Sequence, residues 1–147
     1  MAAAKIESFP RGTETILLVE PDPEYRTLAA FMLSRLGYHV LEARNAMEAV
    51  KLYDERGGGI DLLLAEIRMP RVDGQALTEV LSARDSSMRL LYLGDPDYNR
   101  GPRRVAAPKY LPLLPRPFTM QVLAGCVRSA LDHPCQNPRV LAAGSSA

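Results

Sequence analysis

Short apolar segments alternate with amphipathic segments along most of this chain. Nearly continuous apolar runs occupy residues 15–19, 38–42, 60–65, 89–93 and 111–114, and each has the length of a buried strand. Apolar residues at helical spacing predict helices over residues 23–36, 46–56, 74–84 and 120–131. This alternation predicts right-handed crossovers and a parallel sheet with helices on both faces, an α/β fold.

The residues at the ends of the expected helices support these boundaries. Asp22 and Pro23 suit an N-cap and a first helical residue, and Asn45 begins a capping-box pattern. Gly37 and the glycines at 57–59 are typical helix stops. The stripes expected to face the core comprise Tyr25, Leu28, Ala29, Met32 and Leu36, then Leu77, Val80 and Leu81, and finally Val122, Leu123, Cys126, Val127, Ala130 and Leu131.

Residues 95–110 break the alternation, because they carry Pro96, Pro102 and Pro108 together with Gly101. Proline at this density prevents a regular helix. The helix between the fourth and fifth strands is therefore expected to be lost or much shortened. The segment also contains the basic residues Arg100, Arg103, Arg104 and Lys109. A solvated loop is the simpler interpretation, and a docking site for an acidic macromolecule is the alternative.

Length and composition indicate a single domain in a chain of 147 residues. We expect a flexible tail at 1–12, the folded domain at 13–133 and a disordered tail at 134–147. The net charge of +1 gives no reason to expect nucleic acid or a membrane as partner. No secretory leader or membrane-spanning run is present, so a cytoplasmic location is expected. Cys126 and Cys135 are expected to be reduced thiols.

Chemistry is expected where the predicted strands end. Glu20, Glu66, Gly94 and Arg116 each come just after or at the end of a strand. In parallel α/β sheets, sites form beyond the carboxyl ends of the strands, so these residues should surround one pocket. A guanidinium fits a carboxylate bidentately, which suggests an ion pair between Arg116 and Glu66. The alternative is that Glu66 is a solvated carboxylate. No metal-ligand cluster or nucleophile–histidine–acid arrangement is evident, and the chain is not expected to be an enzyme.

The chain resembles bacterial response-regulator receiver domains over about residues 13–133. The ordered segments that carry this resemblance are Ile16-Leu17-Leu18-Val19-Glu20, Glu66-Ile67-Arg68-Met69-Pro70 with Asp73-Gly74, Leu90-Leu91-Tyr92-Leu93, and Arg116-Pro117-Phe118-Thr119. The resemblance implies a flavodoxin-like, doubly wound, five-stranded parallel sheet. It also implies an acidic pair that holds Mg²⁺, an Asp that takes phosphate from a histidine kinase, a Ser/Thr and a Lys.

Every one of those family positions is altered in this chain. Pro21 stands at the second position of the acidic pair and supplies no ligand. The equivalent positions are Glu66 for the phosphoacceptor, Glu20, Asp22 and Arg68 for the acidic metal pocket, Gly94 and Leu113 for the switch, Arg116 for the Lys, and Pro117 for a cis peptide bond. Glu66 carries its carboxylate about 1.5 Å further out than an Asp would, and Gly94 has no hydroxyl.

These departures predict a pseudo-receiver that takes part in phosphorelay signalling through protein–protein contact without normal Asp phosphorylation. No cofactor is expected, and Mg²⁺ binding should be weak or absent. The expected partner is a protein such as a histidine kinase, and a homodimer is a further option. One alternative is a genuine phosphoacceptor that uses Glu66 with weakened Mg²⁺ binding. The second is the basic-loop module for an acidic macromolecule.

Overall fold

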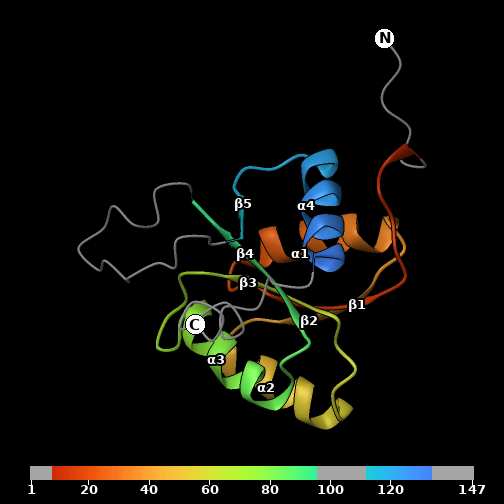
Figure 1. The fold of residues 1–147 in the computed structure, drawn as a ribbon. Coiled ribbons are helices and arrows are strands. Elements are labelled where there is room, and N and C mark those ends of the chain that lie inside the picture. The colour runs from red at the N-terminus through yellow and green to blue at the C-terminus, as the bar shows by residue number, and fades with distance from the viewer. Residues whose placement is uncertain (1–7, 96–111, 134–147) are drawn as a thin grey trace, which may run out of the picture.

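The computed structural model describes residues 8–95 and 112–133 of the chain. Strands and helices alternate from β1 to β4, and β5 is followed by α4 (Figure 1). The strands are β1 (Thr15–Val19), β2 (His39–Ala43), β3 (Leu62–Glu66), β4 (Arg89–Gly94) and β5 (Leu113–Pro115). The helices are α1 (Pro23–Arg35), α2 (Ala46–Arg56), α3 (Gly74–Arg84) and α4 (Met120–Asp132). In these described ranges, no helix has the length and apolar character needed to cross a membrane.

The strands form one parallel sheet in the order β2-β1-β3-β4-β5. This is the flavodoxin-like order, with the switch point between β1 and β3. The expected doubly wound, five-stranded parallel sheet is confirmed. The pairing of Glu66 with Leu93 and of Gly94 with Pro115 aligns the carboxyl ends of β3, β4 and β5 at one edge.

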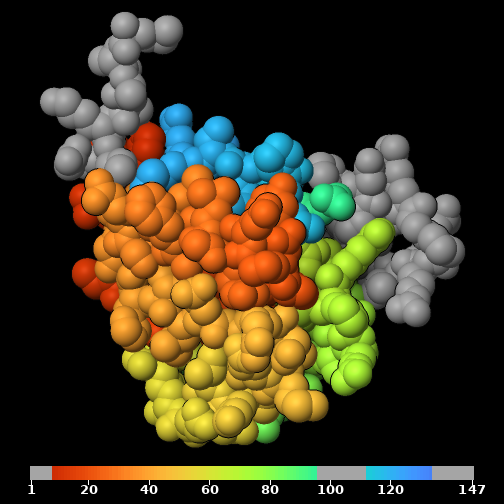
Figure 2. Space-filling model, turned by 180° about the vertical axis from the view of Figure 1, so that it is seen from behind, coloured from red at the N-terminus to blue at the C-terminus, as the bar shows by residue number. Residues whose placement is uncertain are grey.

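Helices cover both faces of the sheet. Helices α1 and α4 pack on one face and α2 and α3 on the other (Figure 1). Seen from behind, α1 in orange lies beneath α4 in blue (Figure 2). The central strands β1 and β3 are fully buried, because each face of both strands meets a layer of helices. Their side chains alternate between the two apolar cores, with Leu18 and Leu64 on one side and Leu17 and Leu63 on the other.

Helix caps hold the ends of the helices as the sequence predicted. The Asp22 side chain accepts a hydrogen bond from the Glu24 amide at 2.9 Å, and Pro23 is the first residue of α1. Asn45 caps α2 by accepting from the Glu48 amide at 2.8 Å. Such caps satisfy amide groups that would otherwise lack partners at the start of a helix. The Asp22 carboxylate is therefore used as the N-cap of α1.

The prediction that Leu28, Val80 and Val122 face the core is wrong. Their exposed fractions are 44%, 40% and 44%. Each lies at the margin of its helical stripe, and a helix lying on an open sheet buries only a band about 100° wide.

The boundaries of the strands also differ from the expected ones by one or two residues. In particular, β3 begins at Leu62, and just before it the Asp61 carboxylate accepts a hydrogen bond from the Thr15 amide at 2.8 Å.

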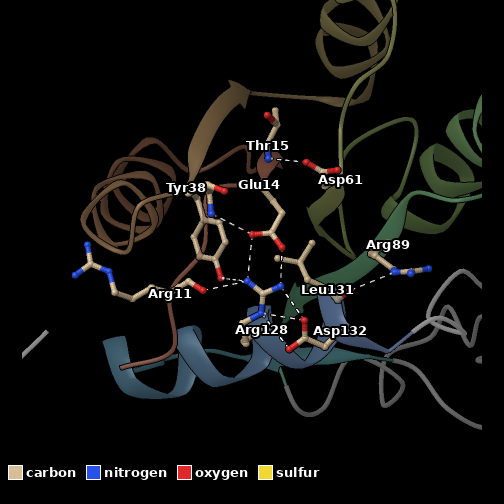
Figure 3. A network of polar contacts seen from close by, with 10 residues as sticks. Arg11, Glu14, Thr15, Tyr38, Asp61, Arg89, Arg128, Leu131 and Asp132 are labelled. Atoms are coloured by element: carbon tan, nitrogen blue, oxygen red, sulfur yellow. Dashed lines mark hydrogen bonds and ion pairs between the residues drawn. The ribbon is translucent and has the colours of Figure 1, made fainter. Parts of the chain in front are cut away.

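Arg128 of α4 joins several segments at the amino edge of the sheet (Figure 3). Its guanidinium contacts the Glu14 carboxylate at 2.6 Å and the Asp132 carboxylate at 2.8 Å. It also donates to the carbonyl oxygen of Arg11 at 3.0 Å. These hydrogen bonds lower the pKa of Glu14 and Asp132. Within the segment expected to be a tail, Arg11 is thus bonded to α4, and Phe9 packs against the core.

The expected loss of the helix between the fourth and fifth strands concerns residues 96–111, which lie outside the described residues. The same holds for the basic residues of that segment and for residues 1–7 and 134–147.

Candidate functional site

The carboxyl ends of four strands bring the expected site residues together. Glu66 and Gly94 are the last residues of β3 and β4, while Glu20 and Arg116 directly follow β1 and β5. The Arg116 amide donates to the carbonyl oxygen of Gly94 at 3.0 Å, which fixes the start of its loop against β4. The Arg116–Pro117 peptide bond is cis.

One guanidinium lies between two buried carboxylates. Arg116 Nη1 is 2.8 Å from Glu20 Oε1, and Arg116 Nη2 is 2.8 Å from Glu66 Oε2. The exposed fractions of the side chains are 2% for Glu20, 5% for Glu66 and 16% for Arg116. We call these three residues the carboxylate clamp. The expected pairing of Arg116 with Glu66 is present, whereas the sharing of Arg116 with Glu20 was not predicted.

Backbone amides hold the outer oxygens of both carboxylates. The Asp22 amide donates to Glu20 Oε2 at 3.1 Å, and the Arg68 amide donates to Glu66 Oε1 at 3.2 Å. Among the described residues, the buried Glu66 Oε2 has no hydrogen-bond partner, although Arg116 Nη2 is close to it. The approach is near enough for charge attraction but lacks hydrogen-bond alignment. Arg116 therefore donates a hydrogen bond to Glu20 and forms an ion pair with Glu66.

Burial changes the ionisation of both carboxyl groups. Loss of solvation raises the pKa of Glu66 to about 7, even though the Arg68 amide and the Arg116 charge oppose this rise. Burial also raises the pKa of Glu20. The physical cause is that two acids with one cation between them leave an uncompensated negative charge in a place with little water. The clamp therefore favours a proton on one of its carboxyl groups.

The residues at this edge do not fit the Mg²⁺ ion that a receiver-type pocket implies. Among residues 8–95 and 112–133, no group of three or more His, Cys, Asp or Glu side chains could hold a metal. Pro21 offers no side-chain ligand, Asp22 caps α1, and a guanidinium occupies the inner oxygens of Glu20 and Glu66. Mg²⁺ demands near-ideal octahedral oxygen geometry, which such a set cannot supply.

Gly94 and Leu113, which were expected to be the switch-equivalent positions, lie side by side in a filled space. A Cβ at Gly94 would be 2.8 Å from Ile67 Cγ2 and 3.4 Å from Leu113 Cδ1. Ile67 is 6% exposed and directly follows Glu66, so its side chain occupies the room that a hydroxyl-bearing residue would need. The sequence did not identify this role of Ile67, because no periodicity reveals which way a loop residue turns.

Restoring a hydroxyl at this position should therefore destabilise the fold. We expect Gly94→Ser to lower the free energy of unfolding by about 1–3 kcal/mol, because Ile is stiff at χ1 and cannot move its methyl group aside. Urea unfolding will measure this change. In an Ile67→Ala background the same substitution should cost clearly less. Equal costs in the two backgrounds would exclude a collision with Ile67.

The loop after β3 approaches the site closely. A Cβ at Gly74 would lie 2.6 Å from the carbonyl oxygen of Glu66, so glycine is required where α3 begins. Arg71 has a φ of 70°, in the left-handed region that favours glycine.

The Tyr25 ring of α1 was expected only as part of the core stripe. It lies 4.9 Å from the Arg116 guanidinium carbon. Helical spacing alone could not distinguish this contact from core packing.

Comparison with known proteins agrees with the fold. A family model described as the response regulator receiver domain matches residues 16–124. The sensor kinase CckA of Brucella abortus is 29% identical over 121 residues, which are 82% of this chain and 13% of that kinase. The rice (Oryza sativa) response regulator ORR22 is 33% identical over 75 residues, or 51% of this chain and 11% of that protein.

Solved structures show the same relationship. The receiver domain of the hybrid histidine kinase CckA has 31% identity and a TM-score of 0.66, with 80% of this chain and 98% of that chain covered. NtrX from Brucella abortus has 22% identity and a TM-score of 0.70, with 82% of this chain and 27% of that chain covered, and supports the fold alone. The matched residues 16–124 run from the second residue of β1 through β5 into the first part of α4. The chain therefore belongs to the response regulator receiver domain family of two-component signalling.

Proposed function

We propose that this chain is a pseudo-receiver, which works in phosphorelay signalling by contacting another protein and not by accepting a phosphoryl group. The observation that carries this proposal is the position of Arg116 between Glu20 and Glu66. The Arg116 guanidinium, a cation that is part of the chain, pairs with the inner oxygens of these carboxylates. The pocket thus holds one arrangement without an added ion or phosphoryl group.

The geometry opposes phosphoryl transfer to Glu66 in two ways. First, in-line attack needs a free carboxylate oxygen, and both oxygens of Glu66 are engaged, by Arg116 and by the Arg68 amide. Second, a developing phosphoryl charge needs a metal or donor groups, and Gly94 brings no hydroxyl. Burial also raises the pKa of Glu66 to about 7, and a protonated carboxyl group is a poor nucleophile.

The proposed partner is a protein of the same signalling system. One of the relatives is a sensor kinase, and this supports a kinase or a kinase-associated protein as the partner. A genuine phosphoacceptor that uses Glu66 is the competing function. A docking site for an acidic macromolecule at residues 95–110 is the other alternative, and it would show as binding that weakens steeply with added salt.

Intact mass spectrometry distinguishes the first two functions. The full chain is incubated with Mg²⁺ and a small-molecule phosphodonor, and separately with a phosphorylated histidine kinase. Glu66→Gln and Glu66→Asp are treated in parallel. The proposal predicts that the wild-type mass is unchanged with both donors. A stoichiometric phosphoryl adduct that is absent from Glu66→Gln would show that Glu66 accepts phosphate and would overturn the proposal.

A further inference from the structure

Arg116 has two acidic groups within reach of the same nitrogen. Its Nη2 is 2.8 Å from the buried Glu66 Oε2 and 4.0 Å from Asp95 Oδ1. The Asp95 side chain is 67% exposed, whereas that of Glu66 is 5% exposed. Turning toward Asp95 would let the guanidinium regain water, which strongly favours a charged group. The contacts with Glu20 and Glu66 favour the inward position, and any group that holds the guanidinium in place adds to this preference.

The Tyr25 ring is in place to do this. The guanidinium carbon lies 4.9 Å from the ring centroid, within the range in which a cation is attracted to an aromatic face. A ring against one face of the planar guanidinium leaves the N–H groups free to point at carboxylates in its plane. This position of the ring is compatible with simultaneous contact of the guanidinium with Glu20 and Glu66.

Tyr25 is itself held by the elements that form the pocket. It lies in the first turn of α1, which Asp22 caps and Pro23 begins. The Asp22 amide donates to Glu20 Oε2, so the start of α1 and the clamp share one carboxylate. The start of the helix that carries the ring is therefore bonded to Glu20.

We propose that Tyr25 is the positioning residue of the carboxylate clamp, and that its ring selects the inward pairing of Arg116 with Glu66 over the outward pairing with Asp95. This proposal rests on the pseudo-receiver function, because it explains how the pocket keeps one arrangement without phosphate. Without the ring, the guanidinium turns toward Asp95, and Glu66 is left buried without its cation.

The test compares variants with and without an aromatic ring. Tyr25→Leu and Tyr25→Met remove the ring, and Tyr25→Phe keeps it as the matched control. Arginine side-chain NMR reports whether rotation of the Arg116 guanidinium is hindered, because a group held on both Nη atoms gives separate signals for them. Carbon-detected titration reports the pKa of Glu66. Both measurements are made without a phosphodonor, so their outcome is independent of phosphorylation.

Separate Nη signals are expected for the wild type and Tyr25→Phe, and merged signals for Tyr25→Leu and Tyr25→Met. The pKa of Glu66 should rise further by about 1 unit without the ring. Adding Asp95→Asn to Tyr25→Leu should restore the separate signals, because the outward partner is gone. Circular dichroism identifies folded variants, and either ring-free variant suffices. A folded ring-free variant that matches the wild type in both measurements would overturn the proposal, as would a lack of rescue by Asp95→Asn.

Discussion

Arg116→Met will lower the free energy of unfolding by about 3–5 kcal/mol at pH 8, because it leaves buried carboxylates without their cation. Methionine keeps most of the length and apolar contact of the side chain and removes only the guanidinium. Chemical denaturation at pH 8 will measure the loss. The loss should shrink at pH 5.5, where Glu20 and Glu66 can take up protons that replace the missing positive charge.

Arg84→Met is the matched control for this substitution. Arg84 contacts Asp54 at 3.0 Å, but the two side chains are 39% and 52% exposed. An exposed ion pair contributes about 0–1 kcal/mol, so this variant should remain close to the wild type. If Arg116→Met cost no more than Arg84→Met at pH 8, the carboxylate clamp would not be a significant source of stability.

Glu66→Gln will make the fold more stable than the wild type at pH 8, by an amount on the order of 2 kcal/mol. Burial raises the pKa of Glu66 from 4.5 to about 7. A raised carboxyl pKa means that the folded state binds the proton more tightly than the unfolded state does. Its favourable contribution is complete below pH 4.5 and is lost as the pH rises through 7. Glutamine stays neutral, and Arg116 then faces a single carboxylate, that of Glu20.

The pH dependence of unfolding provides the measurement. Between pH 5 and pH 8 the wild type should lose stability, whereas Glu66→Gln should change much less. Glu14 provides an internal control of the opposite sign, since hydrogen bonding to Arg128 lowers its pKa. Its contribution is present above its unfolded pKa of 4.5 and is lost on acidification. Glu14→Gln should therefore lower stability above that pH and leave the acid side of the profile unchanged. A flat wild-type profile from pH 5 to pH 8 would contradict the raised pKa of Glu66.

Much of the fold could be predicted because its signals are local. Buried strands read as continuous apolar runs, and Asp22 and Asn45 cap helices where expected. The strand-end rule also brought Glu20, Glu66 and Arg116 to one pocket. The outward turn of Leu28 and Val122 was not predictable in the same way, because it depends on how each helix sits on the sheet.

The finer chemistry of the site depends on contacts between segments far apart in the chain. Whether Arg116 meets one carboxylate or two follows from where β1 and β5 end relative to each other. The contact of the Tyr25 ring with Arg116 depends on the rotation of α1 about its axis, and the filling of the space beside Gly94 depends on the direction of the Ile67 side chain. None of these is encoded in residue spacing. The sequence therefore indicated an acidic pocket with a cation, but not that Arg116 lies between both carboxylates of the clamp.

A crystal structure of the full chain grown with saturating magnesium and beryllofluoride is the most direct test of the carboxylate clamp. The account predicts that the Arg116 guanidinium remains between Glu20 and Glu66 and that neither added ion occupies the pocket. Beryllofluoride bonded to Glu66, with magnesium beside Glu20 and the guanidinium displaced, would contradict it.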